Sequence, residues 1–567
     1  MFDVETLPQY THLYSVSDLH LWGYSGDHNG YPRDFRIFDG KHAGALAWLI
    51  DAVSRTADAC PETALVLNGD VVDFLACRYA KGFDAPNALR HLKGIVEDPV
   101  FQPIWEALRR FVKRKKGDLV IVLGNHDVEL ALPDVQRYLI HYLTSGDRSA
   151  RAHVLFSLDG SGFRCRVGDA QVLLIHGNEV DAFNAVDYGS LHLTARAVNF
   201  EDQAPDFTVN AGSTLVTAAM NDIKRRFQWI DLLKPETEAA VRIISAMPRE
   251  LFDEVSLRQA LDTVYRVGKI ALRDRRRIEH GLLGGDDEEA GAGMFDARIA
   301  AKLDALLGQP RQTGLSDVDA LVKKAEYQLA MGVRPEDLLG RDGNGQRISA
   351  EEMLTVRGGI LRDLRTAFTK DTEAKKRRLR ETIAEVLACD TSFDPTGPDM
   401  ALPKLDKRVG IAIDFLITGH THFERSLERP FAGTYYFNSG TWIRLIDLRD
   451  KLDKGTFDKV WNILMDGSMA CLDGDLGAPM LETAVYDNDD PNRLERQAPM
   501  RLTQVIRSVV HLETLTEERA KSEGLSEGTV IGSLKHVETV PGVSTGGTHE
   551  MVENRRTRRT WNSRGAF

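Results

Sequence analysis

Four short β-rich runs in the first 190 residues each lead directly into a cluster of Asp, Asn or His, and this repeated order constrains the fold more than any other feature. The runs lie at residues 12–17, 64–68, 119–123 and 172–175, with helical stretches between them. Strands that alternate with helices are typical of a layered α/β sheet. Ligands bind such sheets beyond the carboxyl ends of the strands, so we expect the polar clusters to share one site.

Strand-like runs give way to helical stretches in the middle of the chain and then return. Between residues 191 and 404 long stretches at helical spacing predominate, and strand-like runs return at 411–418 and 434–438. The sheet core is therefore predicted to be discontinuous in sequence. We divide the chain into a first part of the core (1–190), a helical insertion or cap (191–404), a second part of the core (405–490) and a C-terminal extension (491–567). The arginine-rich end of that extension, residues 553–567, is expected to be frayed.

Composition limits the classes of protein. Of 567 residues, 43% are hydrophobic and 28% are charged, which is ordinary for a globular protein. No apolar run is long enough for a membrane span, and Asp3 and Glu5 do not suit a signal peptide, so we expect a cytoplasmic protein. The 5 cysteines are widely spaced and predict neither a disulfide framework nor a cysteine zinc site. A net charge of −12 disfavours binding to nucleic acid or anionic membrane over the whole surface.

Five short polar motifs, each after a predicted strand, carry the chemistry. They read Asp18-Leu19-His20, Gly69-Asp70-Val71-Val72-Asp73, Gly124-Asn125-His126-Asp127, His176-Gly177 and Gly419-His420-Thr421-His422. A dinuclear metal site needs several oxygen and imidazole donors, including a carboxylate that can bridge both ions. Glycines beside the donors allow the tight turns that bring them together. Each motif alone also fits a turn, a helix cap or a buried histidine, but all of them in this order favour a metal site.

These motifs resemble the pattern of the calcineurin-like metallophosphoesterase superfamily, D-x-H, G-D-x-x-D, G-N-H-[DE], H-[GA] and G-H-x-H. The resemblance covers about residues 10–190 and 405–450, and it leaves out the insertion and the C-terminal extension. It implies a fold of the α/β class, a layered metallophosphoesterase β-sandwich with flanking helices, here interrupted by the large helical insertion. It also implies a dinuclear metal site at one end of the sandwich.

The resemblance assigns a role to each motif residue. One metal is held by Asp18, His20 and His422, the other by Asn125, His176 and His420, and Asp70 bridges the two. His126 corresponds to the catalytic histidine of the family, and Asp73 orients it. The cofactors expected are two divalent metal ions, manganese first, with iron or zinc as alternatives because Asp, Asn and His donors suit all three.

The activity implied is hydrolysis of a phosphodiester or pyrophosphate bond by a hydroxide bound to both metals, with His126 protonating the leaving oxygen. The protein Ser/Thr phosphatase branch is disfavoured, because Phe74-Leu75 stands where that branch has Arg-Gly and Asp127 where it has Glu. Two alternatives remain open: a nuclease acting on DNA or RNA, and a non-catalytic interaction scaffold.

The partner expected is a phosphate-ester substrate, with a nucleotide or nucleic acid as alternatives; the oligomeric state is left open. The insertion contains basic clusters that could hold a phosphate chain or a nucleic-acid strand. They lie at Lys224–Arg226, Arg273 with Arg275–Arg277, and Lys375–Arg378 with Arg380. The alternative for each cluster is a solvated helix face.

Overall fold

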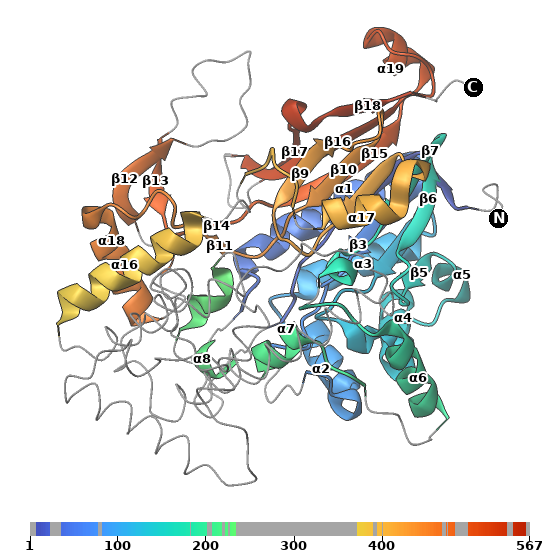
Figure 1. Cartoon of the computed structure of the whole chain (residues 1–567). Helices are drawn as coiled ribbons and strands as arrows, with labels where there is room; N and C mark the ends of the chain where they lie inside the picture. Colours follow the sequence, from blue (N-terminus) through green and yellow to red (C-terminus); the bar gives the residue numbers. More distant parts are fainter. Residues whose placement is uncertain are drawn as a thin grey trace, which may run out of the picture.

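The structure is a computed structural model, and it describes residues 7–22, 36–76, 82–181, 183–200, 207–217, 221–224, 227–233, 371–388, 394–399, 401–467, 472, 475–481, 497–540 and 548–562. Within these ranges the chain is a mixed α/β protein with two large sheets (Figure 1). Most of the predicted helical insertion, including residues 234–370, lies outside them.

The larger sheet has 8 strands and joins the two ends of the chain, in the order β17-β16-β15-β2-β3-β4-β5 with β18 beside β16. Its parallel part consists of β2 (His12–Val16), β3 (Thr63–Asn68), β4 (Asp118–Val122) and β5 (Val154–Ser157). Its antiparallel part consists of β15 (Ser508–Thr514), β16 (Val530–Val540), β17 (Thr548–Glu553) and β18 (Arg559–Trp561). Strand β2 therefore lies between β3 and the C-terminal strand β15, with Tyr14 opposite His511.

The smaller sheet has 6 strands in the order β1-β6-β7-β8-β10-β9. They are β1 (Gln9–Tyr10), β6 (Phe163–Val167), β7 (Ala170–Leu174), β8 (Phe415–Thr418), β9 (Glu424–Glu428) and β10 (Tyr435–Ser439). Strand β8 runs parallel to β7, with Leu416 opposite Leu173, although the predicted insertion separates them in sequence. The sheet is thus discontinuous in sequence, as predicted.

The two large sheets share one buried apolar core. Leu13 and Val66 of the larger sheet and Val172, Ile417 and Phe437 of the smaller sheet belong to the same cluster. The central strands β3 and β8 are buried along their whole length, which explains why they read as apolar runs rather than as alternating patterns. Each such side chain contributes roughly 1.5–3 kcal/mol when it is fully buried.

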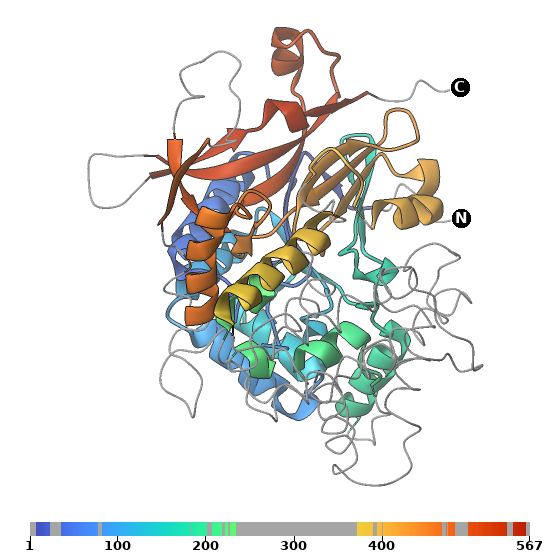
Figure 2. The same ribbon diagram turned by 60° about the vertical axis from the view of Figure 1, so that its left-hand side comes forward.

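Helices cover the face of the larger sheet that points away from the smaller sheet. They are drawn in blue to blue-green in Figures 1 and 2. They are α1 (Ala43–Ala59), α2 (Ala85–Glu97), α3 (Gln102–Arg114) and α4 (Pro133–Thr144). Helix α3 shows why the sequence folds this way: Ile104, Leu108 and Phe111 recur at helical spacing and are buried on one side.

A separate apolar cluster lies around α16 (Thr372–Ala388) and α18 (Lys454–Asp466). It includes two small sheets, formed by β11 (Leu445–Ile446) with β14 (Thr503–Gln504) and by β12 (Asp475–Leu481) with β13 (Gln497–Arg501). Trp229 is buried in it and donates its indole N–H to the carbonyl of Leu464.

The remaining elements are short. The α-helices are α5 (Arg148–Arg151), α6 (Tyr188–Asn199), α7 (Ala211–Leu215), α8 (Asn221–Lys224), α17 (Leu402–Val409) and α19 (Glu517–Ser522). Single 3₁₀ turns lie at Gly40–His42, Val128–Ala131, Asn178–Val180, Gln228–Leu232, Gly410–Ala412 and Arg555–Thr557. None of the helices within the described ranges is long and apolar enough to cross a bilayer.

The C-terminal end differs from its prediction. The expectation of a frayed end over residues 553–567 is wrong for its described part, because β18 pairs with β16 and Trp561 is buried. Arg559 lies in β18 itself, and the pairing with β16 together with the burial of Trp561 holds this strand in place.

Candidate metal centre

The polar motifs follow the carboxyl ends of five strands, and their side chains meet at one place. Asp18 follows β2, Asp70 follows β3, Asn125 follows β4, His176 follows β7 and His420 follows β8. Strands β2, β3 and β4 run parallel in one sheet, and β7 and β8 run parallel in the other. The site therefore takes residues from both sheets at one end of their shared core.

The first set of possible ligands consists of Asp18, His20 and His422. Their ligand atoms all lie within 4.8 Å of one another. Nε2 of His422 is 3.2 Å from Oδ1 of Asp18 and 3.3 Å from Nε2 of His20. All three side chains are buried. This is the trio that the resemblance assigns to one metal.

A second set, Asp70, His176 and His420, adjoins the first. Oδ2 of Asp70 is 3.1 Å from Nε2 of His176 and 3.7 Å from Nε2 of His20, so one carboxylate oxygen lies near a histidine of each set. Asp70 also groups with His20 and His126. A carboxylate between two sets of donors is what a bridging ligand requires.

Two buried donor atoms at this centre fit a bound cation. Oδ1 of Asn125 is buried and has no hydrogen-bond partner among the described residues, and Nε2 of His176 is buried beside Oδ2 of Asp70 at 3.1 Å without the alignment of a regular hydrogen bond. Nδ1 of His176 donates its N–H to the carbonyl of Asn68 at 2.8 Å, so Nε2 is the nitrogen that faces the centre. Because buried polar atoms are rarely left unpaired, the two atoms are suited to metal coordination.

Several motif residues at the centre share a left-handed backbone conformation. Eight described non-glycine residues have positive φ, and five of them belong to the motifs, with φ between 43° and 67°. These five are Asp18, His20, Asp70, His420 and His422. Left-handed backbone costs roughly 1–3 kcal/mol per residue and is concentrated at functional sites. The strain turns each side chain off its strand end toward the common centre.

Asp73 contacts two histidines of the centre. Its Oδ2 is 3.2 Å from Nδ1 of His20, and its Oδ1 is 3.1 Å from Nδ1 of His126. The second contact is close but poorly aligned for a hydrogen bond. A carboxylate beside Nδ1 keeps the proton on that nitrogen. Nε2 of each ring then remains available for metal binding or proton transfer. The His126 side chain is 19% exposed, the largest value among these residues, so it can reach a substrate.

Burial and charge oppose each other at Asp70 and His126. Burial favours the protonated form of Asp70, but His176 and His126 hold the pKa of its carboxyl well below the usual range. Burial lowers the pKa of His126, but Asp73 and Asp70 together raise it to about 9. The Asp70 carboxylate is therefore ionised, as a metal ligand must be, and His126 retains a proton near neutral pH.

Residues 438–441 support the centre, a role that we did not assign from the sequence. Asn438 donates to the carbonyl of Gly419 at 2.7 Å. The hydroxyls of Ser439 and Ser17 are 2.7 Å apart, and Thr441 donates to the carbonyl of Asp18 at 2.6 Å. The signal available in the sequence was the position of this Asn-Ser-Gly-Thr segment at the end of a predicted strand.

Two further carboxylates, also missed, hold the motif loops. Asp127 accepts the backbone N–H groups of Gly124 (2.7 Å) and Val71 (2.8 Å), and burial raises its pKa to about 7. Asp181 lies 2.9 Å from Nε2 of His420, which leaves Nδ1 of that ring for the centre. Histidine ligands of metals commonly give their other nitrogen to a carboxylate in this way.

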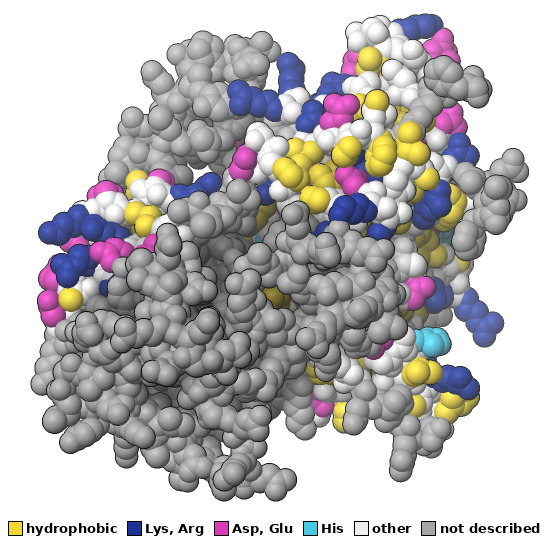
Figure 3. All heavy atoms as spheres, viewed as in Figure 1, with side chains coloured by type: hydrophobic (Ala, Val, Ile, Leu, Met, Phe, Trp, Pro, Cys, Tyr) yellow, Lys and Arg dark blue, Asp and Glu magenta, His cyan; other side chains and the backbone are white. Residues whose placement is uncertain are grey.

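Two side chains of the basic cluster in α16 are paired with acidic residues. In α16, Lys376 pairs with Glu373 and Asp458, and Arg378 lies near Glu381 and Glu385. At the left of Figure 3, where α16 lies, Lys and Arg side chains are interleaved with Asp and Glu. Arg225, Arg226 and the cluster at residues 273–277 lie outside the described residues.

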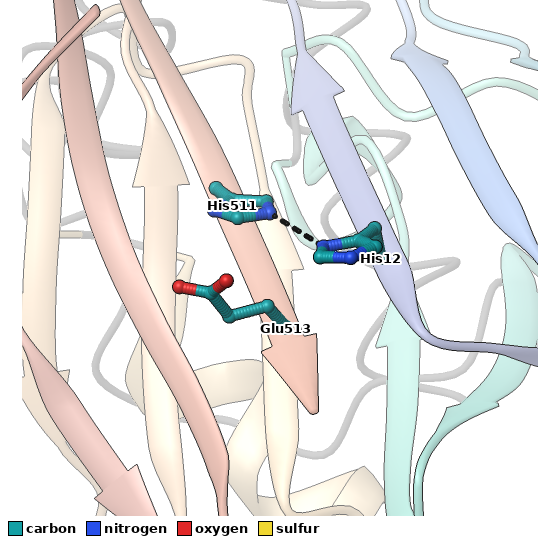
Figure 4. A group of neighbouring side chains, drawn as sticks. All are labelled: His12, His511 and Glu513. Carbon is teal, nitrogen blue, oxygen red and sulfur yellow. Dashed lines mark hydrogen bonds between the residues drawn. The ribbon is translucent and has the colours of Figure 1, made fainter. Parts of the chain in front are cut away.

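A separate polar group lies on the pair of strands β2 and β15. His12 belongs to β2 and His511 and Glu513 belong to β15, with donor atoms within 4.8 Å of one another (Figure 4). The histidine rings are only 7° from coplanar, with centroids 5.6 Å apart and Nδ1 of His12 3.3 Å from Nε2 of His511. The rings therefore meet end to end in one plane, as in an imidazole–imidazole hydrogen bond.

This geometry is unfavourable for a metal, because the facing nitrogens point at each other and not at a shared third point. Burial, followed by the charges of Lys535, His12 and Arg519, lowers the pKa of His511 well below the usual range. Both rings are thus neutral, and one donates to the other. We interpret this group as a structural hydrogen bond between the N-terminal and C-terminal parts of the larger sheet.

No protein-family model matches the chain, and no curated protein sequence matches it.

Proposed function

We propose that this chain is a metal-dependent phosphoesterase of the calcineurin-like superfamily, which hydrolyses a phosphodiester or pyrophosphate bond. The observation that carries the proposal is the position of Asp70 between two sets of histidine and carboxylate donors. The pairing of two sheets around one core, with the donors at one end, agrees with the sandwich that the resemblance implies.

The residues divide between two divalent cations. Asp18, His20 and His422 would hold one, Asn125, His176 and His420 the other, and Asp70 both. Two divalent cations bound here would supply an acidified water and would neutralise charge on the phosphate oxygens. The amide of Asn125 adds an oxygen donor without adding negative charge that would repel a phosphate anion.

His126 is suited to protonate the leaving oxygen. Its Nδ1 faces Asp73 and its partly exposed ring carries a proton near neutral pH, so Nε2 can donate to an alkoxide or phosphate as the bond breaks. Asp73 also faces His20, so one carboxylate orients the proton donor and a metal ligand together. These contacts support a role for Asp73 in both proton donation and metal binding.

The proposal is tested with the purified full-length chain. Metal content is measured by mass spectrometry, and hydrolysis of bis(4-nitrophenyl) phosphate is followed with Mn²⁺ added and after chelation. We expect close to two metal ions per chain at saturation and hydrolysis that chelation abolishes. A screen of nucleotides, cyclic nucleotides, nucleoside diphosphate conjugates and labelled DNA or RNA then identifies the substrate class. A chain that binds no Mn²⁺, or that hydrolyses none of these esters, would remove the proposal.

A further inference from the structure

Asp399 lies where the chain returns from the predicted insertion to the core, and it is buried. One of its carboxylate oxygens, Oδ1, accepts the backbone N–H groups of Ala401 (3.1 Å) and Leu402 (3.0 Å) at the start of α17. This contact satisfies N–H groups that have no partner inside the helix. One half of the carboxylate therefore has an ordinary structural role.

The other oxygen, Oδ2, faces the candidate metal centre. It accepts the hydroxyl of Tyr436 at 2.5 Å, the hydroxyl of Thr421 at 3.2 Å and the amide of Asn438 at 3.4 Å. Thr421 is the residue between His420 and His422, and Asn438 also donates to Thr421 at 2.9 Å. The carboxylate thus holds the middle of the loop that carries two predicted metal ligands.

That loop needs external support because of its backbone. His420 and His422 have φ values of 67° and 64°, and the residue between them is Thr421. Non-glycine residues keep such conformations only where their surroundings over-determine them. Asp18 accepts the backbone N–H of His420, and Asp181 contacts the ring of the same residue. Asp399 is the carboxylate that fixes Thr421.

We propose that Asp399 is a positioning residue that holds the segment Gly419–His422 in its metal-binding shape, so that the returning end of the predicted insertion is coupled to the metal centre. The inference rests on the proposed function, because it requires His420 and His422 to bind metal. Groups that hydrogen-bond to the surroundings of a ligand typically change metal affinity by about 10- to 100-fold when they are replaced.

Two variants test the contacts of Oδ2 with the loop separately from the contacts of Oδ1 with helix α17. Asp399→Asn keeps an oxygen for the N–H groups at the start of α17 but puts an NH₂ group where Oδ2 accepts hydrogen bonds. Thr421→Val removes the contact from the loop side and leaves the helix untouched. Asp394→Asn is the matched control, because Asp394 accepts the N–H and hydroxyl of Thr396 in the same returning segment, is exposed, and forms no hydrogen bond with the loop within the described part of the chain.

The measurement is Mn²⁺ affinity by calorimetry, at a temperature where circular dichroism shows every variant folded. We expect Asp399→Asn and Thr421→Val each to weaken binding of the ion held by His420 or His422 by about 10- to 100-fold, and the double variant to be little worse than either. Asp394→Asn should bind as the wild type does.

The outcomes distinguish the two proposals. A wild-type chain that binds no Mn²⁺ would remove the proposed function, and this inference with it. Two ions bound by the wild type, with affinity unchanged within twofold in Asp399→Asn, would leave the proposed function in place and overturn the positioning role. Full additivity of the two substitutions would also overturn it, since the effects would then be independent.

Discussion

The backbone N–H of His420 donates to both carboxylate oxygens of Asp18, at 3.1 Å and 3.0 Å, although 402 positions separate the two residues. Asp18 follows the central strand of the larger sheet, and His420 follows a strand of the smaller sheet. The contact ties the two sheets together at the candidate metal centre. Neither loop can keep its shape without the other, so changes in one should be felt at both sets of ligands.

Replacing Asp70 by Asn should lower the number of bound metal ions more than replacing any other predicted ligand. The substitution removes the negative charge near both sets of histidines while keeping the size of the side chain. We expect metal content by mass spectrometry to fall well below two ions per chain, and hydrolysis to fall with it. Asp51→Asn, at an exposed ion pair with Arg110, is the control and should keep both. Full metal occupancy in Asp70→Asn would contradict the bridging assignment.

His126→Ala should separate chemistry from metal binding. We expect both metals to stay, because other residues supply the proposed coordination, while the rate falls by about 10²–10⁴. The loss should be smaller for nitrophenyl esters than for alkyl esters, because a good leaving group needs no proton. His141→Ala, at an exposed position in α4, should leave the rate unchanged. An equal loss for both kinds of ester would rule out the role in leaving-group protonation.

Asp73→Asn should weaken metal binding and lower the rate of hydrolysis together, unlike His126→Ala. Asp73 contacts Nδ1 of His20 as well as Nδ1 of His126, so its charge orients a metal ligand and the proton donor. We expect Mn²⁺ affinity to weaken by about 10- to 100-fold, together with a lower rate at saturating metal. Calorimetry and steady-state kinetics on the same preparation measure the two effects. If affinity is unchanged, the contact with His20 has no role in binding.

Gly124→Ala should disturb the centre through sterics alone. A Cβ at residue 124 would collide with the carboxylate of Asp70, so the loop or the ligand must shift. Overpacking of this kind costs about 1–3 kcal/mol. We expect a lower Tm and fewer bound metal ions, measured by calorimetry and mass spectrometry. Gly44→Ala is the control, since a Cβ there meets nothing within 4 Å. Normal metal content in Gly124→Ala would show that this close approach is not needed.

The hydrogen-bonded pair of His12 and His511 should make the fold sensitive to acid. Burial holds the pKa of His511 well below its unfolded value, which is about 6.5. The unfolded chain then binds a proton that the folded chain resists, so stability is complete above that pH and declines as the pH falls below it. One group contributes at most about 1.4 kcal/mol per pH unit.

His511→Phe tests this directly, because a flat ring can still pack against Tyr14 but cannot take a proton. Urea unfolding of the variant and the wild type is compared at pH 7.5 and at pH 5.5. We expect the wild type to lose more stability between the two values than the variant does. Equal losses would mean that this pair does not contribute to the pH dependence.

The parts of the fold and site that follow from local patterns were predicted well. The runs that became β3, β4 and β8 are apolar because all or nearly all of their residues are buried, and each is followed by glycine and by polar residues. The structure brings the motif residues together, although their metal and catalytic roles remain predictions.

Contacts between distant segments could not be predicted in the same way. Asp181 and Asp399 act on His420 and Thr421 only because of how the chain folds back, and nothing in their own neighbourhoods distinguishes them from turn or cap residues. The basic residues of α16 likewise suggested an open surface, but Asp458 of α18 supplies one of their partners. Pairing of this kind depends on tertiary packing and leaves no periodic signal.

The position of β15 beside β2 has a consequence for the order of events at the ribosome. The strand that leads into Asp18 acquires its second neighbour only when residues 508–514 have been synthesised. Until then one edge of β2 presents unpaired N–H and carbonyl groups that can pair with other chains. Contacts so distant in sequence form slowly, because a long loop must close first. The nascent protein therefore carries an unpaired strand edge next to its first predicted metal-binding motif for nearly the whole of translation.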